Sequence, residues 1–247
     1  NVDSDDYIAL DFLETIYAAI MQSDADIIAI DHIFVSEEGK KVGSYRNPLD
    51  AGVYKGEIVE QLKDRLLYDL NLPYSNYGCL SFSLCSKAIR KELYQPCQQG
   101  IPNGIRMGDD LAVSIPAISQ ANSLHMLRYE GYFYRQRKSS IIHTFDPNEI
   151  GRIELLVEYM KASIPQIPEK NMAGYIINLV MDYISKAAAT LTCYREFADH
   201  IREKCLPMVR PALSVFCHKG LRITDRVKLW CLRKRMWRIF WWLYRNR

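Results

Sequence analysis

The chain has 247 residues, of which 49% are apolar and 25% charged, so it can build a substantial core and is not a disordered or collagen-like chain. Its net charge of +3 is uneven, because residues 221–247 hold nine Lys or Arg and one acid and carry +8, leaving −5 on residues 1–220. The seven cysteines are odd in number and form no Cys-x-x-Cys pair, and no two histidines stand four residues apart. These patterns favour a cytoplasmic protein with reduced thiols and argue against a zinc site.

The first 145 residues alternate between helical and strand-like patterns. Ile8, Phe12, Ile16 and Ile20 recur every fourth residue and predict one face of a helix that begins near residue 8. The further elements expected here are a strand over 25–35, a helix over 57–70, a short helix over 86–93, a loop over 96–108, a helix from Asp109 or Asp110, and a strand or strand pair over 124–134. This alternation predicts an α/β fold.

After Pro147 the pattern is helical only. Helices are expected over 149–162, roughly 171–205, and 224–244, with 163–168 as a linker. The sequence thus predicts three parts: an α/β domain over 1–145, a helical extension over 146–220 and a basic aromatic helix over 221–247.

The first candidate site is the acidic run Asp3-Ser4-Asp5-Asp6, placed between a strand and a helix. Carboxylate oxygens suit Mg²⁺ or Mn²⁺, which usually take one or two carboxylates together with substrate phosphates. The alternative is a helix cap, because Asp and Ser side chains accept hydrogen bonds from the free N–H groups of a first turn.

The second candidate is Asp109-Asp110, which follows Gly108 at another helix start. A carboxylate held there is suited to act as a general base toward a substrate hydroxyl. A plain helix cap is again the alternative.

The third candidate is residues 132–141, in which three aromatic residues precede Arg135, Arg137 and Lys138. Arginine side chains pair well with phosphate oxygens. A half-buried strand that runs into a solvated basic loop would give the same pattern.

The order and spacing of these segments resemble those of one protein family. The segments are Asn-Val-Asp-Ser-Asp-Asp-Tyr-Ile (1–8), Met-Gly-Asp-Asp-Leu (107–111) and Tyr-Arg-Gln-Arg-Lys-Ser-Ser-Ile (134–141). Ala-Asp-Ile-Ile-Ala (25–29) and Ser-Lys-Ala-Ile-Arg-Lys-Glu-Leu (86–93) look similar to the same family. Over residues 1–145 the chain resembles the family 2 glycosyltransferases of bacteria, which build cell-surface polysaccharides.

The resemblance implies a GT-A fold, a nucleotide-sugar donor, a glycan or lipid-linked acceptor, and no nucleic-acid partner. Asp3 and Asp5 would be the Asp-x-Asp element that holds Mg²⁺ or Mn²⁺ on the donor diphosphate, with Asp6 shaping the site. Asp110 would be the catalytic base of an inverting displacement, and Asp109 replaces the Glu usual in this family. Arg135 and Arg137 would contact the donor phosphates or the acceptor.

The same resemblance implies that the strand and the Asp-Asp-Gly-Ser-type segment that bind the nucleotide precede residue 1, so this chain is expected to be the C-terminal portion of such a domain. The alternative is a non-catalytic glycosyltransferase-like fragment that serves only as a membrane or protein interaction module. An in-frame Ile-Val-Pro-x-Tyr-Asn-like segment upstream would favour the enzyme.

The C-terminal segment suggests a membrane-surface helix over 224–247. All four Trp residues of the chain lie in it, and no apolar run is long enough to span a bilayer. The apolar residues that fall on one side of a continuous helix are Leu229, Leu232, Met236, Phe240 and Leu243. An apolar side flanked by cations predicts peripheral binding to an anionic membrane, here the inner face of the cell membrane. A terminal helix that packs its apolar side on the body is the alternative.

Overall fold

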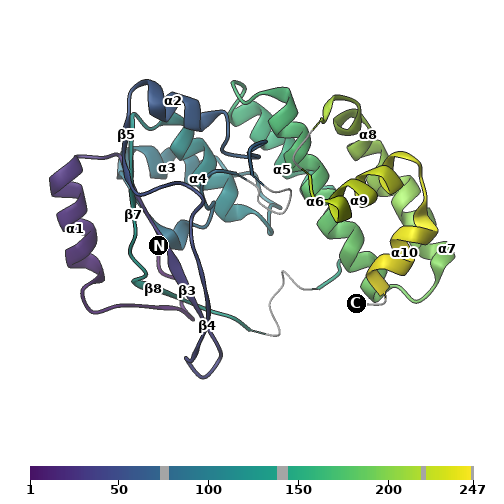
Figure 1. Cartoon of the computed structure of the whole chain (residues 1–247), viewed down its shortest axis with the longest axis horizontal. Helices are drawn as coiled ribbons and strands as arrows, with labels where there is room; N and C mark the ends of the chain where they lie inside the picture. The colour runs from purple at the N-terminus through teal and green to yellow at the C-terminus, as the bar shows by residue number, and fades with distance from the viewer. Residues whose placement is uncertain (73–77, 138–143, 218–220, 246–247) are drawn as a thin grey trace. The chain divides into compact units, whose positions relative to one another are not determined.

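The computed structural model describes residues 1–72, 78–137, 144–217 and 221–245 (Figure 1). The chain forms two compact units. Unit 1 comprises Asn1–Leu66 and Cys79–Ser140, and unit 2 comprises Leu67–Gly78 and Ile141–Arg247. The extension and the C-terminal segment, which the sequence suggested as separate parts, therefore belong to one unit, and that unit also takes a segment from within the expected α/β domain.

Unit 1 contains two small mixed sheets with the same internal plan. Its strands are β1 (Tyr7–Ile8), β2 (Ile27–Ile30), β3 (His32–Val35), β4 (Lys41–Tyr45), β5 (Gly52–Lys55), β6 (Lys87–Ile89), β7 (Ser123–Leu127) and β8 (Tyr132–Arg135). One sheet has the order β1-β8-β3-β4 and the other β5-β7-β2-β6. In each sheet a central parallel pair, β3 with β8 or β2 with β7, is flanked by antiparallel strands. An α/β fold is confirmed.

The expected strand over 25–35 is two strands in different sheets, and the break between them is at Asp31. This carboxylate is buried and pairs with Arg128, Nη1 to Oδ1, at 3.0 Å. It also accepts a 2.7 Å hydrogen bond from the Asn47 backbone N–H. Arg128 lies between β7 and β8, so the ion pair joins the two places where the chain leaves one sheet for the other. A buried carboxylate is stable only with a cation and hydrogen-bond donors beside it, and the break in the strand brings Asp31 to these groups.

Helices cover the sheet β5-β7-β2-β6 on both faces (Figure 1). The helical elements of unit 1 are α1 (Phe12–Ser23), α2 (Glu57–Lys63), η1 (Leu84–Ser86), α3 (Lys91–Gln99) and α4 (Asp109–Gln120). On one side α1 packs Ile16 and Ala19, with Phe12 and Ile20, against Ile28 and its neighbours. Most of α4 is buried, and it packs against α3.

Several boundaries differ from the sequence prediction. Ile8 lies in β1 and not in a helix, although Phe12, Ile16 and Ile20 face the core as expected. Helix α2 ends at Lys63 rather than at residue 70, and from Leu67 onward the chain belongs to unit 2. Residues 86–93 are a strand followed by the start of α3, and α3 continues through Pro96 to Gln99. Strands β4 and β5 were not predicted, since most of their residues are exposed or half-buried and show no clear apolar alternation.

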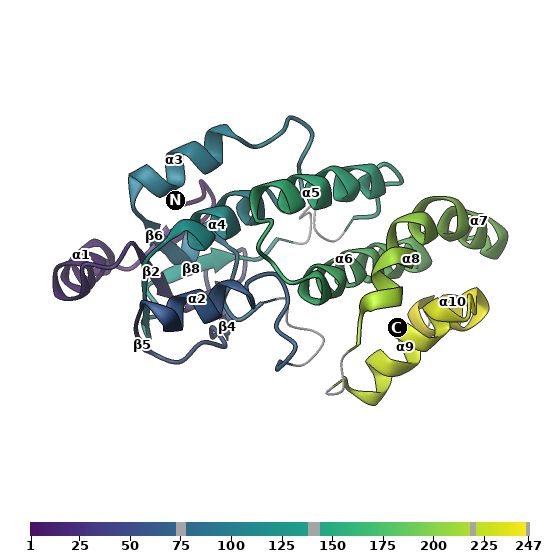
Figure 2. The same ribbon diagram turned by 90° about the horizontal axis from the view of Figure 1, so that it is seen from above.

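Unit 2 is helical (Figure 2). Its elements are α5 (Glu149–Ser163), α6 (Glu169–Thr190), α7 (Tyr194–His200), the π-helical turn η3 (Ile201–Cys205), α8 (Leu206–Val215), α9 (Ile223–Arg233) and α10 (Trp237–Arg245). Helix α6 is central: 14 of its 22 residues are buried, and α5, α8 and α10 contact it. The helix expected over 149–162 is confirmed, whereas the one expected over 171–205 is interrupted after Thr190.

Tyr68 explains why the segment after α2 belongs to unit 2. Its ring packs edge-on against Phe216 at 5.5 Å and lies over Gly174 in α6. The Asn171 side-chain amide donates a 2.6 Å hydrogen bond to the Tyr68 carbonyl. A buried aromatic side chain thus anchors the segment among the helices.

The expected helix over 224–244 is two helices with a break at Lys234–Met236. Arg235 adopts a left-handed φ of 55°, and the Met236 N–H donates to the Cys231 carbonyl at 2.9 Å. This hydrogen-bond pattern is the Schellman motif, which ends many helices and usually has Gly at the left-handed position. Residues 231–237 contain no Gly, so the sequence did not predict the break. Leu229, Leu232 and Phe240 are buried in unit 2. The side predicted to face a membrane is therefore largely part of the core. In the described part of the chain, no helix has the length and apolarity to cross a membrane.

Candidate functional site

The acidic run at the start of the chain forms a turn that is fastened to β8. The Asp6 N–H donates to the Asp3 carbonyl at 3.1 Å. The hydroxyl of Tyr132, a fully buried residue, donates to Asp6 Oδ2 at 2.7 Å and accepts the Asp3 N–H at 3.2 Å. Burial and the Asp6 carboxylate raise the pKa of the Tyr132 hydroxyl, so this group stays a donor at neutral pH.

The Asp6 carboxylate makes hydrogen bonds within the protein. Its second oxygen, Oδ1, accepts the Arg135 backbone N–H at 2.8 Å. Both carboxylate oxygens therefore hold β8, and the side chain orients the turn that carries Asp3 and Asp5. A helix cap does not account for the run, because α1 begins only at Phe12, with Asp11 as its N-cap residue.

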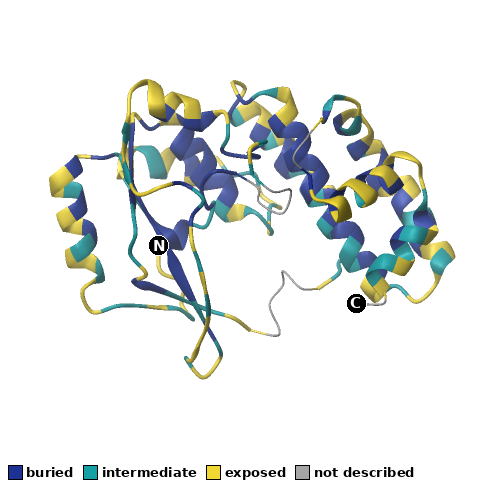
Figure 3. Ribbon diagram, in the orientation of Figure 1, coloured by how far each residue is buried: buried dark blue, intermediate teal, exposed yellow. Residues whose placement is uncertain are grey.

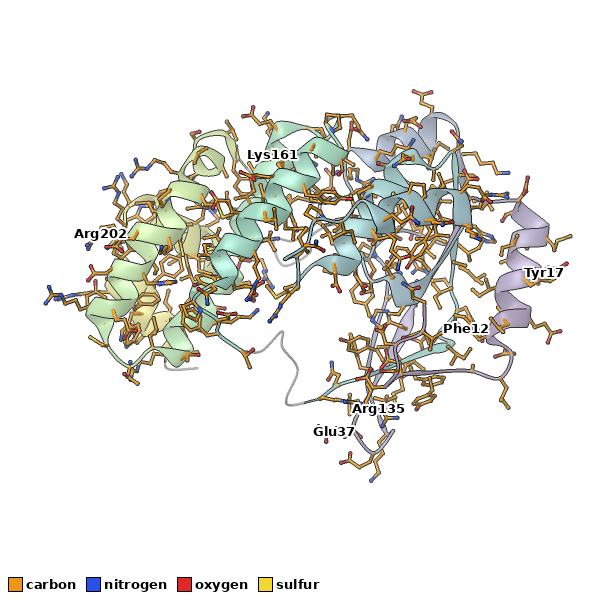
Figure 4. The ribbon with its side chains drawn as sticks, turned by 180° about the vertical axis from the view of Figure 1, so that it is seen from behind. Phe12, Tyr17, Glu37, Arg135, Lys161 and Arg202 are labelled. Carbon is orange, nitrogen blue, oxygen red and sulfur yellow. The ribbon has the colours of Figure 1, made fainter. Side chains whose placement is uncertain are left out.

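Asp5 lies between the two arginines that the sequence singled out. Arg137 Nε is 3.1 Å from Asp5 Oδ2, and Arg135 Nε donates to the Asp5 carbonyl at 2.8 Å. Arg135 also donates to the Glu37 carbonyl and lies over the ring of Tyr7, 5.8 Å from its centroid (Figure 4). Both predicted cations are thus placed beside the acidic turn. Lys138 and residues 139–141 lie outside the described residues.

The second acidic site, Asp109-Asp110, directly follows a glycine at the start of α4. Gly108 has a φ of 88°, a left-handed conformation that favours glycine, and α4 starts directly after it. Asp109 is exposed, whereas Asp110 is half-buried. Asp110 Oδ2 accepts the Leu84 backbone N–H at 3.1 Å, and the N-cap position of α4 is Gly108, which has no side chain to cap the helix. The carboxylate of Asp110 is therefore oriented by a neighbouring segment.

The two acidic pairs lie within electrostatic reach of each other, although about a hundred residues separate them in sequence. Partial burial raises the pKa of Asp3, and the negative charges of Asp6, Asp5 and Asp109 raise it further. Burial raises the pKa of Asp110, and Asp109 and Asp3 add to this, while the Leu84 N–H and the Lys87 ammonium oppose it. Like charges gathered at one place destabilise one another unless a cation joins them.

Two residues that the sequence did not single out border this cluster. Burial raises the pKa of the Cys85 thiol to about 12, and the carboxylates of Asp110 and Asp3 add to the rise, so it is neither a thiolate nor a nucleophile at neutral pH. Lys87 is buried and donates to the Ser83 carbonyl at 2.8 Å. Burial lowers the pKa of Lys87 to about 8. Only the fold places these side chains at the site: Lys87 lies in the segment 86–93, whose resemblance to a family assigned it no role, and Cys85 belongs to no motif.

The donor set fits a divalent cation shared with a phosphate ligand better than a closed metal cage. Over the part of the chain that the structure describes, no three His, Cys, Asp or Glu side chains are grouped to hold an ion. Mg²⁺ commonly needs only one or two carboxylates besides phosphate oxygens and water. The pKa of Asp3 is raised first by burial and then by the neighbouring carboxylates, and a bound cation would relieve the second effect. Asp5 already faces Arg137.

Comparison with solved structures shows a fold similar to that of S. aureus TarS. The crystal structure of S. aureus TarS residues 1–349 matches with a TM-score of 0.55 and 13% sequence identity, over 97% of this chain and 63% of that one. The same protein in complex with UDP-GlcNAc matches with a TM-score of 0.58 and 13% identity, over 97% of this chain and 64% of that one. The chain thus spans less than two thirds of the TarS structures it resembles. No known family profile and no curated protein matches it in sequence.

Proposed function

We propose that the protein transfers a sugar from a nucleotide-sugar donor to a hydroxyl of a glycan or lipid-linked acceptor, with inversion at the anomeric carbon. The observation that carries the proposal is the electrostatic coupling of Asp3 with Asp109 and Asp110. Asp3 belongs to the turn that bonds to Arg135 and Arg137, and Asp110 is oriented by the Leu84 N–H. The likeness to TarS, whose structure has been solved with UDP-GlcNAc, supports a donor of that class.

In this proposal Asp110 is the general base. Its carboxylate accepts the proton of the acceptor hydroxyl while that oxygen forms a bond to the anomeric carbon. The bond to the leaving nucleoside diphosphate breaks on the opposite face, so the configuration inverts. The raised pKa of Asp110 makes its carboxylate a stronger base than an ordinary carboxylate. The Leu84 N–H fixes the direction from which it acts.

Asp3 and Asp5 are the residues that would hold Mg²⁺ or Mn²⁺, and such an ion, when bound, neutralises charge on the departing diphosphate. In this proposal Arg137, which pairs with Asp5, contributes a positive charge to the same group. Asp6 and Tyr132 position this turn rather than touch the donor. Asp109 is exposed and adds negative charge beside Asp110.

The test is sugar transfer by the full-length protein, detected by mass spectrometry with a panel of nucleotide sugars that includes UDP-GlcNAc. Asp110→Asn should lower turnover by at least about 100-fold, since general-base catalysis typically contributes that much or more. Donor binding should stay nearly unchanged. Asp109→Asn is the matched control and should be milder. Near-normal turnover of Asp110→Asn would refute the role of this residue as the base.

A further inference from the structure

Helix α9 carries an exposed apolar stripe that the sequence pattern did not single out. Figure 3 shows where exposed residues lie along the ribbon. Ile223, Val227 and Trp230 are 78%, 42% and 49% exposed. Their spacing of four and three residues places them on one side of the helix. The side of the C-terminal segment that the sequence suggested for lipid is mostly buried, so this stripe is a different surface.

Cations flank the stripe. Arg226 follows Ile223 by three residues and precedes Trp230 by four, so it lies along the edge of the stripe, and it is exposed. Lys234, four residues after Trp230, is exposed at the C-terminal end of the helix. We name Ile223, Val227 and Trp230 with these two cations the α9 face.

The charge beside the α9 face is not neutralised by acids of the same segment. Asp225 is the single acid in residues 221–247, and its side chain is only 2% exposed. It pairs inside the unit with Arg222 at 2.8 Å and with Lys228 at 3.5 Å. The exposed surface of the segment is therefore cationic, with a tryptophan and two aliphatic side chains at its centre.

Another exposed apolar stripe provides a contrast. In α1, Leu13, Tyr17 and Met21 are 72%, 64% and 67% exposed, again at four-residue spacing, and Tyr17 points away from unit 1 (Figure 4). That helix contains no Lys or Arg and carries Glu14. The two stripes are alike in apolarity and differ in charge, so the charge distinguishes their partners.

We propose that the α9 face is a docking surface for an anionic lipid bilayer, on which α9 lies parallel to the membrane. An aromatic and aliphatic stripe enters the region between headgroups and acyl chains, while flanking cations meet anionic headgroups. The proposal is independent of sugar transfer, because no residue of the acidic site takes part.

Sedimentation with vesicles tests the proposal on the whole chain. Vesicles of equal parts phosphatidylglycerol and phosphatidylcholine should bind the protein, vesicles of phosphatidylcholine alone should bind it far less, and salt should weaken binding. Trp230→Ser should lower the affinity by at least about tenfold, because a large aromatic side chain no longer enters the lipid. The double variant Arg226→Gln, Lys234→Gln should lower the affinity for anionic vesicles by about 30-fold. Each cation contributes about 1 kcal/mol, and about 1.4 kcal/mol corresponds to about tenfold in affinity.

The control is Tyr17→Ser in α1, which removes an exposed aromatic residue from a stripe without cations and should leave vesicle binding unchanged. Brominated phosphatidylcholine mixed into the anionic vesicles should quench tryptophan emission, and Trp230→Phe should remove most of that quenching while the melting temperature stays the same. Equal loss of binding in the α1 control, or vesicle binding unchanged by Trp230→Ser and by the two cation substitutions, would overturn the proposal.

Discussion

Tyr132→Phe removes one oxygen atom and with it both hydrogen bonds that fasten the acidic turn to β8. The Tyr132 hydroxyl bonds to a carboxylate oxygen of Asp6 and to the N–H of Asp3, and the tyrosine is completely buried. A hydrogen bond to a charged group contributes about 1.5–3 kcal/mol and a neutral one about 1 kcal/mol, so we expect a loss of ~2–4 kcal/mol. The Arg135 N–H still satisfies the other oxygen of Asp6, which keeps the estimate within this range.

The assay must report on unit 1. All four tryptophans lie in unit 2, so tryptophan fluorescence should show little change and serves as an internal control. Hydrogen exchange in peptides that contain β1 and β8 measures the local opening directly, and its protection should fall by about 30-fold or more. Tyr134→Phe, in the same strand, is the matched control and should have a small effect. Equal protection in the two variants would refute the role of the Tyr132 hydroxyl.

Three more predictions follow from the site and the packing. A chelator should abolish sugar transfer by the full-length protein, and Mg²⁺ or Mn²⁺ should restore it; full activity in chelator would exclude the metal role of Asp3 and Asp5. Lys87→Met should move the acid limb of kcat/KM to higher pH, because the Lys87 charge lowers the pKa of Asp110 and activity is lost as pH falls through that pKa; an unchanged limb would contradict this coupling. Gly174→Ala should destabilise unit 2 by about 1–3 kcal/mol, because the new Cβ would lie 2.6 Å from the Tyr68 ring. Gly151→Ala in α5 is the control: its Cβ would meet no atom within 4 Å, so it should stabilise the helix by about 0.5–1 kcal/mol. Urea unfolding followed by tryptophan fluorescence measures both effects.

Local patterns in the sequence predicted part of the fold well. Four-residue apolar spacing placed Phe12, Ile16 and Ile20 on the inner face of α1, and it placed the helix over 149–162 almost to the residue. Both predictions succeeded for the same reason: a helix that buries one face needs apolar residues at three- and four-residue spacing, and this spacing is visible in the sequence. The acidic runs were likewise visible, because aspartates placed so close together are rarely needed by packing alone.

Tertiary structure decided which of those aspartates does what. Asp3, Asp5 and Asp6 are the same amino acid, yet both oxygens of Asp6 bond to β8, whereas Asp5 pairs with Arg137. The sequence could not separate them, because their partners come from residues about 130 positions away.

Long-range contacts also decided where elements end and what they cover. The segment over 25–35 divides at Asp31, where the buried carboxylate pairs with Arg128 from the connection between β7 and β8. The C-terminal helix divides at Arg235 because two backbone hydrogen bonds, from Arg235 to Leu232 and from Met236 to Cys231, close a Schellman turn without a glycine. Composition alone determined that the C-terminal segment is aromatic and basic. Which of its side chains face water depends on the surface that the rest of unit 2 offers to Leu229, Leu232 and Phe240, and that surface exists only after folding.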